Sequence, residues 1–423
     1  MHVILSAKSV YPFHPVGGVQ KYVYYFAKHL AAQGVDLEIV APLDNGKPKT
    51  ECYDGLKYRF LSPSIYRYLE YPVGWMGVHM FSRSLNQYLQ TAKFDLLHSF
   101  DLTGYRYVRN ERRRPVIAHI FTDNYLSNPI SMKNPLSLLH LTGSKFERIK
   151  ETKVKISPFA DKATKMKYWA QYLFKIKPMY QCLKRSEAIF YEADIFQEDV
   201  NSLYRLTPQK SAVIPVGVDI PFIQKSIAVE HVSREEMGFS QKDIILITVN
   251  RLAADKGVDK IVLALERIVR DMPQVKLIIV GSGYQEKEIS DLIDKKSLNG
   301  HVLHLKDIPE DSLYQYYDIA DIYVSAFSYP GSSISTLEAM ACALPVITTA
   351  QPWLVRGGGN GVFLESNRPE RIADAVLRMI RGNRLKEQGN VSRNIVEEFS
   401  WDRIARKAVK QYEEVLRRYG QNG

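Results

Sequence analysis

Residues 330–342, PGSSISTLEAMAC, are the part of this sequence that is best suited to chemistry. They follow an apolar run at residues 322–325, which predicts a buried parallel strand, and they pass through a glycine- and serine-rich turn into a helix. A helix that begins in this way presents unpaired backbone N–H groups and the positive end of its dipole, and both attract a phosphate. The residues expected to form this phosphate site are Gly331, Ser332, Ser333, Ile334 and Ser335.

Two cationic residues upstream, Arg251 and Lys256, follow another apolar run at residues 244–249 and can reach the same anion. An arginine grips a diphosphate with two parallel hydrogen bonds, and a lysine supplies a point charge. Glu338 lies within the helix, where its carboxylate would accept hydrogen bonds from the hydroxyls of a ribose attached to the phosphate. The set predicts a site for a nucleotide-activated sugar, because such groups stabilise the diphosphate that departs when the sugar–phosphate bond breaks.

Each of these residues also has a simpler interpretation. Arg251 would suit the cap of a strand end, Lys256 a solvated surface position, and Glu338 a surface carboxylate near a helix N-terminus. Gly17 and Gly18 follow the first apolar run of the chain. They would bring backbone close to a bound ligand, because no side chain intervenes, or they would form only a tight turn.

Short apolar runs alternate with amphipathic helical segments along most of the chain and form two α/β halves. The strands expected in the first half are residues 2–6, 37–40, 96–98, 116–119 and 188–190. The strands expected in the second half are residues 244–249, 275–280, 302–305, 322–325 and 345–348. Alternating strands and helices predict parallel sheets with helices on both faces, and right-handed crossovers make each half a doubly wound sheet. Ligands of such sheets bind outside the carboxyl ends of the strands, where the glycine-rich loops fall.

The length and composition are those of a globular protein with two domains. A chain of 423 residues is too long for one ordinary core, and 45% hydrophobic with 24% charged residues is an ordinary globular composition. The three cysteines, Cys52, Cys182 and Cys342, are scattered, which argues against a zinc site or a disulfide framework and indicates a reducing compartment. The apolar start is too short for a signal peptide, and no apolar run approaches the roughly 20 residues of a membrane span.

The net charge of +11 is concentrated in one segment. Residues 125–186 contain 13 lysines and arginines against three acidic residues, a net charge of +10, interleaved with aromatic residues. Such a pattern can bind anionic lipid headgroups or a polyanion. The simpler interpretation is a solvated helical face whose aromatic side chains lie in the core. Nucleic acid is not expected as a partner, because no recognised nucleic-acid module appears.

Several motifs, in a fixed order, resemble those of the retaining family-four glycosyltransferases of GT-B fold. The resemblance rests on Gly17-Gly18, on residues 215–219 (PVGVD), on Arg251 with Lys256-Gly257, on residues 280–283 (VGSG), and on residues 337–342 (LEAMAC) with Pro345-Val346. Each motif alone is weak, whereas all of them in this order, along most of the chain, form a specific signal.

The resemblance implies an α/β, GT-B fold, with two Rossmann-like doubly wound parallel-sheet domains facing each other across a cleft. Residues 1–215 would form an N-terminal acceptor-binding domain, with a basic insertion at about 125–186, and residues 216–400 a C-terminal domain that binds the nucleotide sugar. Residues 401–423 would form a helix that returns to the N-terminal domain. The resemblance implies no cofactor and no metal, and the sequence has no Asp-x-Asp. The co-substrate would be a nucleotide diphosphate sugar, a UDP-sugar being favoured over a GDP-sugar.

Two positions depart from the pattern of the family. Pro330 stands where the family usually has a glutamate that contacts the donor sugar, so donor selection is expected to differ or to use backbone groups and Ser332. Phe121 stands where the family often has a catalytic-site histidine. His119 lies two residues earlier on the same face of the strand, where it would point into the cleft as a catalytic residue or be a core histidine bonded to a backbone carbonyl. Asp123 is a further polar candidate there.

The predicted function is that of a retaining, metal-independent glycosyltransferase of the hexosyltransferase type, with Arg251, Lys256 and His119 as its catalytic residues. It would serve glycolipid, cell-wall or polysaccharide synthesis. The basic segment predicts a lipid-linked or polyanionic acceptor, peripheral contact with an anionic membrane, and a cytoplasmic location at the inner face of the cell membrane. Two alternatives remain open. One is a nucleotide-sugar epimerase of the same fold, which needs no acceptor, and the other is a catalytically degenerate subunit that binds nucleotide or glycan.

Overall fold

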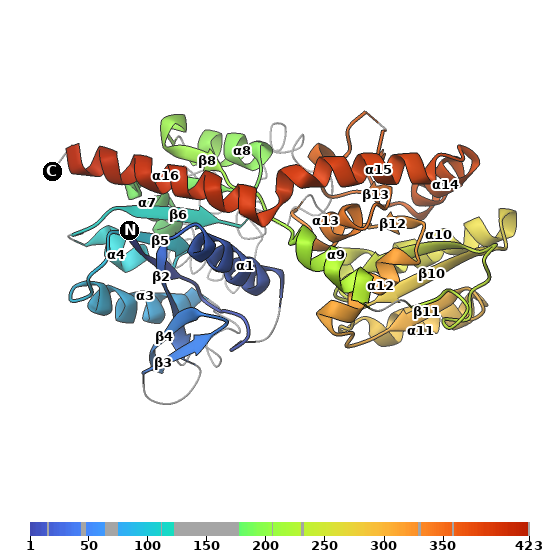
Figure 1. The fold of residues 1–423 in the computed structure, drawn as a ribbon, viewed down its shortest axis with the longest axis horizontal. Coiled ribbons are helices and arrows are strands. Elements are labelled where there is room, and N and C mark those ends of the chain that lie inside the picture. Colours follow the sequence, from blue (N-terminus) through green and yellow to red (C-terminus); the bar gives the residue numbers. More distant parts are fainter. Residues whose placement is uncertain are drawn as a thin grey trace, which may run out of the picture. The chain divides into compact units, whose positions relative to one another are not determined.

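The structure, a computed structural model, shows a chain that folds into two compact units (Figure 1). It describes residues 1–14, 17–43, 48–63, 75–110, 112–121, 177–204, 206–229, 232–328, 331–357 and 359–421. Among these, residues 1–121, 177–216 and 401–421 belong to unit 1, and residues 217–400 belong to unit 2. Most of the basic segment predicted at residues 125–186, together with Asp123 and Pro330, lies outside the described residues.

The sheet of unit 1, in the part of the chain that the structure describes, has eight strands in the order β3-β4-β2-β1-β5-β6-β7-β8. Neighbouring strands are parallel except for the pair β3 and β4. The strands are β1 (His2–Ser6), β2 (Asp36–Leu43), β3 (Lys49–Tyr53), β4 (Leu56–Pro63), β5 (Leu96–Phe100), β6 (Val116–Ile120), β7 (Ala188–Tyr191) and β8 (Ser211–Val213). The helices are α1 (Gly18–Ala32), α3 (Trp75–Leu89), α4 (Tyr105–Arg109), α7 (Lys177–Arg185), α8 (Asp194–Tyr204) and α16 (Trp401–Gln421).

The hairpin of β3 and β4 is absent from the strands expected from the sequence. Its turn is the dipeptide Asp54-Gly55, and both residues have positive φ, of 48° and 74°. An Asp-Gly pair favours the two-residue turn whose twist matches that of the flanking strands. The signal was therefore present, but β3 is short and mostly exposed, so the hydrophobic pattern did not mark it.

Unit 2 contains a six-stranded parallel sheet in the order β11-β10-β9-β12-β13-β14. The strands are β9 (Ile244–Val249), β10 (Val275–Val280), β11 (Val302–Leu305), β12 (Ile322–Val324), β13 (Val346–Thr348) and β14 (Gly361–Phe363). The helices are α9 (Ile220–Val229), α10 (Val258–Asp271), α11 (Glu286–Lys295), α12 (Glu310–Asp318), α13 (Ile334–Ala341), α14 (Pro369–Arg381) and α15 (Leu385–Val396). The expected fold class, two α/β units built on parallel sheets, is confirmed.

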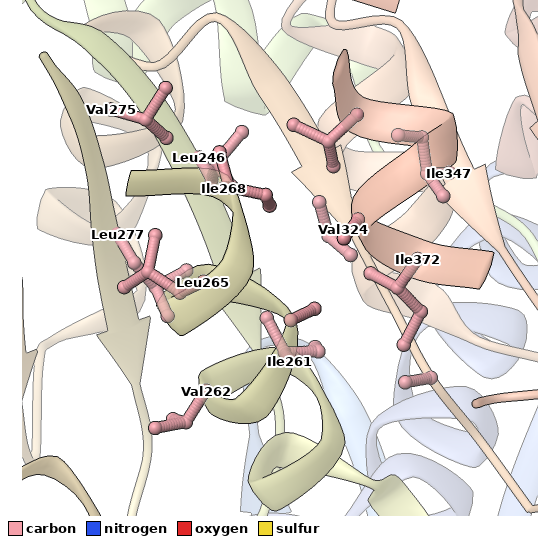
Figure 2. Packing of buried hydrophobic residues seen from close by; sticks show 14 of the residues in the cluster. Leu246, Ile261, Val262, Leu265, Ile268, Val275, Leu277, Val324, Ile347 and Ile372 are labelled. Carbon is pink, nitrogen blue, oxygen red and sulfur yellow. The ribbon is translucent and has the colours of Figure 1, made fainter. Parts of the chain in front are cut away.

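The core of unit 2 follows from the spacing of apolar residues on α10 (Figure 2). Ile261, Leu265 and Ile268 recur at intervals of three or four residues and therefore share one face of the helix. This face packs in one buried cluster with Leu246 of β9 and Leu277 of β10. The cluster fixes α10 against the sheet, and with it the loop that connects β9 to α10.

A buried hydrogen-bond chain joins α16 to the sheet of unit 1, where this helix lies beside α1 (Figure 1). The Tyr412 hydroxyl on α16 lies 2.5 Å from His98 Nδ1 on β5, and His98 Nε2 lies 3.0 Å from His119 Nδ1 on β6. All three side chains are fully buried. Burial lowers the pKa of His98 well below its ordinary value, with a smaller contribution from His119, and burial lowers the pKa of His119 to about 3.

We expect acid to destabilise unit 1 through these two histidines. Above about pH 6.5, His98 and His119 are neutral in both the folded and the unfolded chain, so they add no pH dependence. Below that pH the unfolded chain binds protons that folded His119 does not accept until about pH 3. The free energy of unfolding then falls by up to about 1.4 kcal/mol per pH unit for each histidine. His119→Phe should therefore reduce the acid slope that is measured by urea unfolding between about pH 6 and pH 4.5.

The matched control is Phe121→Leu, because the ring of Phe121 stacks on His119 in the same cluster and carries no titrating group. This substitution should lower the free energy of unfolding by a similar amount at each pH and leave the slope unchanged. An acid slope of His119→Phe equal to that of the wild type would contradict the assignment of His119 as a neutral buried group.

Candidate functional site

The loops that follow β9 and β12 are joined by close backbone contacts. Gly257, at the end of the β9 loop, has a φ of +65°, and a Cβ placed on it would lie 2.0 Å from the carbonyl oxygen of Ala326. The Ser328 N–H group donates a hydrogen bond of 2.9 Å to the carbonyl oxygen of Asp255. These contacts join residues 255–257, at the end of the predicted cationic segment, to Ala326 and Ser328, which follow β12 on the way to α13.

Arg251 and Lys256 flank one carboxylate in the β9 loop. The Asp255 carboxylate lies 4.0 Å from Arg251 Nη2 and 3.4 Å from Lys256 Nζ. The Lys256 ammonium also lies 4.5 Å from the centre of the Phe327 ring, which holds it against the β12 loop. The Arg251 side chain is 68% exposed, so its long contact with Asp255 holds it weakly and leaves it open to a larger anion.

The N-terminus of α13 is ordered by its own serine side chains. Ser333 is the N-cap residue, and its hydroxyl oxygen accepts the Thr336 N–H at 3.3 Å. The Ser335 hydroxyl lies 2.9 Å from the Ser333 hydroxyl and 2.9 Å from the Tyr323 hydroxyl of β12. The backbone N–H groups of the first helical turn point away from the helix, because helical geometry gives them no partner inside it. The turn predicted to bind phosphate is therefore a capped helix start at the carboxyl end of a parallel strand.

Glu338 lies one turn further along α13 and is buried, with 6% of its surface exposed. The hydroxyl groups of Tyr314 and Tyr317, both on α12, donate hydrogen bonds of 3.4 Å to its two carboxylate oxygens. Burying a carboxylate is costly unless it accepts such hydrogen bonds. Glu338 is therefore held by its neighbours in one position, unlike the surface carboxylate that was the simpler interpretation.

The loop after β10 supports the β9 loop from the other side. Gly281 has a φ of +135°, and a Cβ placed on it would lie 2.1 Å from the carbonyl oxygen of Asn250. A Cβ on Gly283 would lie 2.3 Å from the carbonyl oxygen of Leu252. These two glycines of the predicted VGSG motif let the two backbones touch. The next residue, Tyr284, was not among the residues expected from the sequence, yet its hydroxyl oxygen accepts the Ala254 N–H at 2.9 Å.

In unit 1, Gly17 and Gly18 begin α1, Gly17 as the N-cap in an extended conformation and Gly18 as the first helical residue. A Cβ on Gly18 would meet no atom within 4 Å, and a Cβ on Gly17 would meet chiefly the end of the flexible Gln20 side chain. Contacts within unit 1 therefore do not explain why both positions are glycine.

His119 belongs to the buried chain with His98 and Tyr412 rather than to an exposed surface. Its side chain is fully buried, and its ring lies among aromatic rings that include those of Tyr22 and Phe121. Its hydrogen-bond partner is another imidazole, not the backbone carbonyl considered above. Its Nε2 atom is buried and has no hydrogen-bond partner among the described residues, and its predicted catalytic role stays a prediction.

The described residues also contain no group of three or more histidine, cysteine, aspartate or glutamate side chains that could hold a metal ion. None of the described helices combines the length and the apolar character that a membrane-crossing segment needs.

Two family models match successive parts of the chain. Residues 16–221 match the model described as Glycosyltransferase Family 4, and residues 230–397 match that described as Glycosyl transferases group 1. A relative that matches along most of its length is the uncharacterized glycosyltransferase MJ1069 of Methanocaldococcus jannaschii. It is 26% identical over 423 residues, which cover 95% of this chain and 95% of that protein.

Other relatives match over about half of their length. MJ1607 of the same organism, also an uncharacterized glycosyltransferase, is 26% identical over 53% of this chain and 59% of that protein. The alpha-monoglucosyldiacylglycerol synthase of Acholeplasma laidlawii is 27% identical over 37% of this chain and 40% of that protein.

Solved structures share the fold at low sequence identity. Sucrose-phosphate synthase from Thermosynechococcus elongatus has a TM-score of 0.71 at 18% identity, and the match covers 98% of this chain and 98% of that chain. HepE from Anabaena, solved in complex with UDP-glucose, has a TM-score of 0.64 at 16% identity, with 98% of this chain and 100% of that chain covered. The chain therefore belongs to the glycosyltransferases of GT-B fold, with an amino-terminal half of family 4 and a carboxyl-terminal half of group 1.

Proposed function

We propose that this chain is a retaining glycosyltransferase that moves a sugar from a nucleotide diphosphate sugar to an acceptor hydroxyl. The observation that supports the proposal is the joining of the β9 loop, which carries Arg251 and Lys256, to the β12 loop, which leads to the N-terminus of α13. Positive side chains and a helix N-terminus at one place are suited to a departing diphosphate.

Each residue of the site has a role in this reaction. Arg251 binds the diphosphate with its guanidinium, and Lys256 adds a point charge that Phe327 holds in place. The backbone N–H groups of the turn at residues 331–335 complete the cradle. Glu338 accepts hydrogen bonds from the ribose hydroxyls, with its carboxylate already fixed by α12.

Retention of configuration needs no dedicated strong base in this site. The bond between the anomeric carbon and the phosphate oxygen breaks, and the acceptor oxygen bonds to the anomeric carbon on the face that the phosphate leaves. The acceptor proton passes to the departing phosphate, whose charge is rising as the bond breaks. Burial of His119 is compatible with this route, because no step requires an imidazole.

The donor is proposed to be a UDP-sugar bound without a metal ion. HepE, which shares the fold, was solved with UDP-glucose, and that supports the choice of UDP over GDP. Arg251, Lys256 and the α13 N-terminus supply positive charge of the kind that a divalent ion would otherwise supply. Gly17 and Gly18 are proposed to be substrate-binding residues of unit 1, since the contacts described within that unit do not require glycine there.

We expect Arg251→Ala and Lys256→Ala each to lower kcat/KM for donor turnover by about 100-fold or more. Removing one preorganised donor to a developing anion typically has an effect of this size. The measurement is release of nucleoside diphosphate from a panel of nucleotide sugars, with water or a lipid acceptor. The matched control is Arg270→Ala, because the Arg270 side chain is 70% exposed, close to the 68% of Arg251, but lies in the last turn of α10.

Three results would contradict the proposal. Unchanged turnover in Arg251→Ala and Lys256→Ala would show that the diphosphate does not bind at this loop. An isomerised nucleotide sugar formed without release of nucleoside diphosphate would identify an epimerase. Nucleotide binding without any turnover would identify a degenerate subunit.

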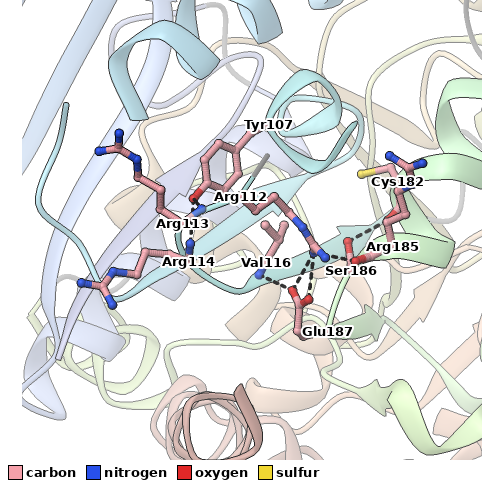
Figure 3. Close-up of polar contacts among 9 residues, drawn as sticks. All are labelled: Tyr107, Arg112, Arg113, Arg114, Val116, Cys182, Arg185, Ser186 and Glu187. Carbon is pink, nitrogen blue, oxygen red and sulfur yellow. Dashed lines mark hydrogen bonds and ion pairs between the residues drawn. The ribbon is translucent and has the colours of Figure 1, made fainter. Parts of the chain in front are cut away.

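The acceptor is proposed to be lipid-linked or polyanionic and to be met at the cytoplasmic face of an anionic membrane, in glycolipid, cell-wall or polysaccharide synthesis. One relative is named an alpha-monoglucosyldiacylglycerol synthase, and diacylglycerol is a lipid. Unit 1 also carries a cluster of cations on α4, on the loop at residues 112–114 and at the carboxyl end of α7, here called the arginine cluster. Figure 3 shows its members Arg112, Arg113, Arg114 and Arg185. Its exposed members are Arg106, Arg109, Arg113, Arg114, Lys184 and Arg185.

The arginine cluster is held together by hydrogen bonds to backbone carbonyls. Arg185 Nη1 donates to the carbonyl of Arg109 at 2.9 Å, and Arg112 Nη1 donates to the carbonyl of Arg185 at 2.6 Å. Glu187 pairs with Arg112 at 2.8 Å, and the exposed members remain as a positive surface. Each basic residue near an anionic membrane contributes about 1 kcal/mol of attraction.

We expect the triple variant Arg106→Glu, Arg114→Glu and Lys184→Glu to lose flotation with vesicles that contain anionic lipid. The charge change of three reversals turns attraction into repulsion at the membrane surface. Flotation should also fall with added salt, because exposed charges are screened.

The matched control carries the same charge change on unit 2, at the exposed Lys287, Lys295 and Lys386. It should float like the wild type. Equal flotation of the arginine-cluster variant and the wild type would exclude this membrane contact, and binding to nucleic acid instead of vesicles would assign the cluster to another polyanion.

A further inference from the structure

Tyr284, which none of the roles above uses, is the most exposed of the large apolar side chains in the described residues. Its side chain is 75% exposed, and it directly follows the loop of Gly281 and Gly283 at the carboxyl end of β10. A single exposed tyrosine on a protein surface needs no special explanation. Tyr284 differs from such a residue because it is held in place at the edge of the proposed donor site.

Three contacts fix Tyr284 over the loop that carries the cations. Its hydroxyl oxygen accepts the Ala254 N–H at 2.9 Å, between the positions of Arg251 and Lys256 in the sequence. On one side of it, the backbone of Gly283 lies against that of Leu252, and on the other side the Gln285 N–H donates 3.1 Å to the carbonyl of Leu252. The ring therefore presents a large apolar surface to solvent while its polar end is bound.

Such an arrangement favours binding of a flat ligand. A tyrosine that is already ordered loses little conformational freedom when a ligand packs on it, so more of the contact energy appears as affinity. Aromatic side chains stack on nucleobases of every kind, because each base has a π-face.

The connection from β11 to β12 indicates which part of the donor reaches Tyr284. In the sheet, β10 and β9 lie between β11 and β12. The connection from β11 to β12, which contains α12, therefore has to pass both strands. The carboxylate of Glu338 faces this helix through Tyr314 and Tyr317. A ribose that is bound by Glu338 on the side of the diphosphate toward β10 would direct its base over the carboxyl end of that strand, where Tyr284 lies.

We propose that the Tyr284 ring is the stacking surface for the nucleobase of the donor. This assignment rests on the proposed donor site. The ring contributes affinity for the nucleoside and does not choose among bases, because stacking makes no contact with the hydrogen-bonding edge of the base.

The test is calorimetric titration of the full chain with UDP and, separately, with inorganic pyrophosphate, which has no base. Tyr284→Ala should weaken UDP binding by about 5- to 100-fold and leave pyrophosphate binding unchanged. Tyr284→Trp and Tyr284→Phe, which keep an aromatic ring and lose the contact with Ala254, should each weaken UDP binding less than alanine does. Phe13→Ala, which alters an exposed aromatic ring in unit 1, should change neither titration.

Equal affinity of Tyr284→Ala and the wild type for UDP would overturn the assignment. Equal weakening for UDP and pyrophosphate would also overturn it, because the effect would then act through the loop and not through the base. If the proposed donor site itself were wrong, the result would differ. The wild type and Arg251→Ala would then bind pyrophosphate with the same low affinity as each other, and likewise UDP. The wild type could also bind pyrophosphate through Arg251 but bind UDP no more tightly than pyrophosphate. This result would support the phosphate site and contradict the stacking role of Tyr284.

Discussion

The proposed donor site depends on one contact, the approach of Gly257 to the carbonyl oxygen of Ala326. Any side chain at residue 257 would place a carbon 2.0 Å from that oxygen, and the φ of +65° disfavours other residues as well. Without this approach the β9 and β12 loops would separate, and the Ser328–Asp255 hydrogen bond would have no reason to form. The cations of the one loop and the helix start of the other would then be independent surface features, neither of which is sufficient to bind a diphosphate.

Two further glycines allow a third loop, the one after β10, to pack closely on the β9 loop. Gly281 and Gly283 let the β10 loop rest on the β9 loop with backbone against backbone, so three neighbouring strand ends form one packed layer. The layer rests on the buried face of α10, whose apolar residues fix the helix to the sheet. Electrostatic stabilisation of a departing group needs donors that do not have to reorganise, and a layer of interlocked loops provides this rigidity.

Much of this arrangement could be predicted from the sequence, because alternating strands and helices place their loops at one edge of a parallel sheet. Arg251, Lys256 and the turn at residues 331–335 were expected there for that reason, and the structure joins their loops. Their roles as substrate-binding groups remain predictions. Tyr284 could not be identified, because what distinguishes it is a hydrogen bond to a residue 30 positions earlier. The buried chain that includes His119 could not be identified either, because it continues through His98 to Tyr412, which lies 314 positions after His98.

The proposed cradle of backbone N–H groups and two cations would recognise the diphosphate, which is the same in every nucleoside diphosphate sugar. Such a cradle contributes affinity and charge stabilisation but does not distinguish one base or one sugar from another. A stacking surface at Tyr284 would share this property, since it too meets a feature common to all bases. Discrimination among bases and sugars then has to come from polar groups of the protein at the edge of the base and around the sugar. A wrong substrate binds less tightly there, because it leaves a buried polar group without its hydrogen bond. Pro330 bears on this point, because a proline lacks the carboxylate that a glutamate would offer to the sugar hydroxyls. In the proposed site, sugar selection would therefore differ from that of the family, or it would use neighbouring backbone and hydroxyl groups, which add no negative charge beside the diphosphate.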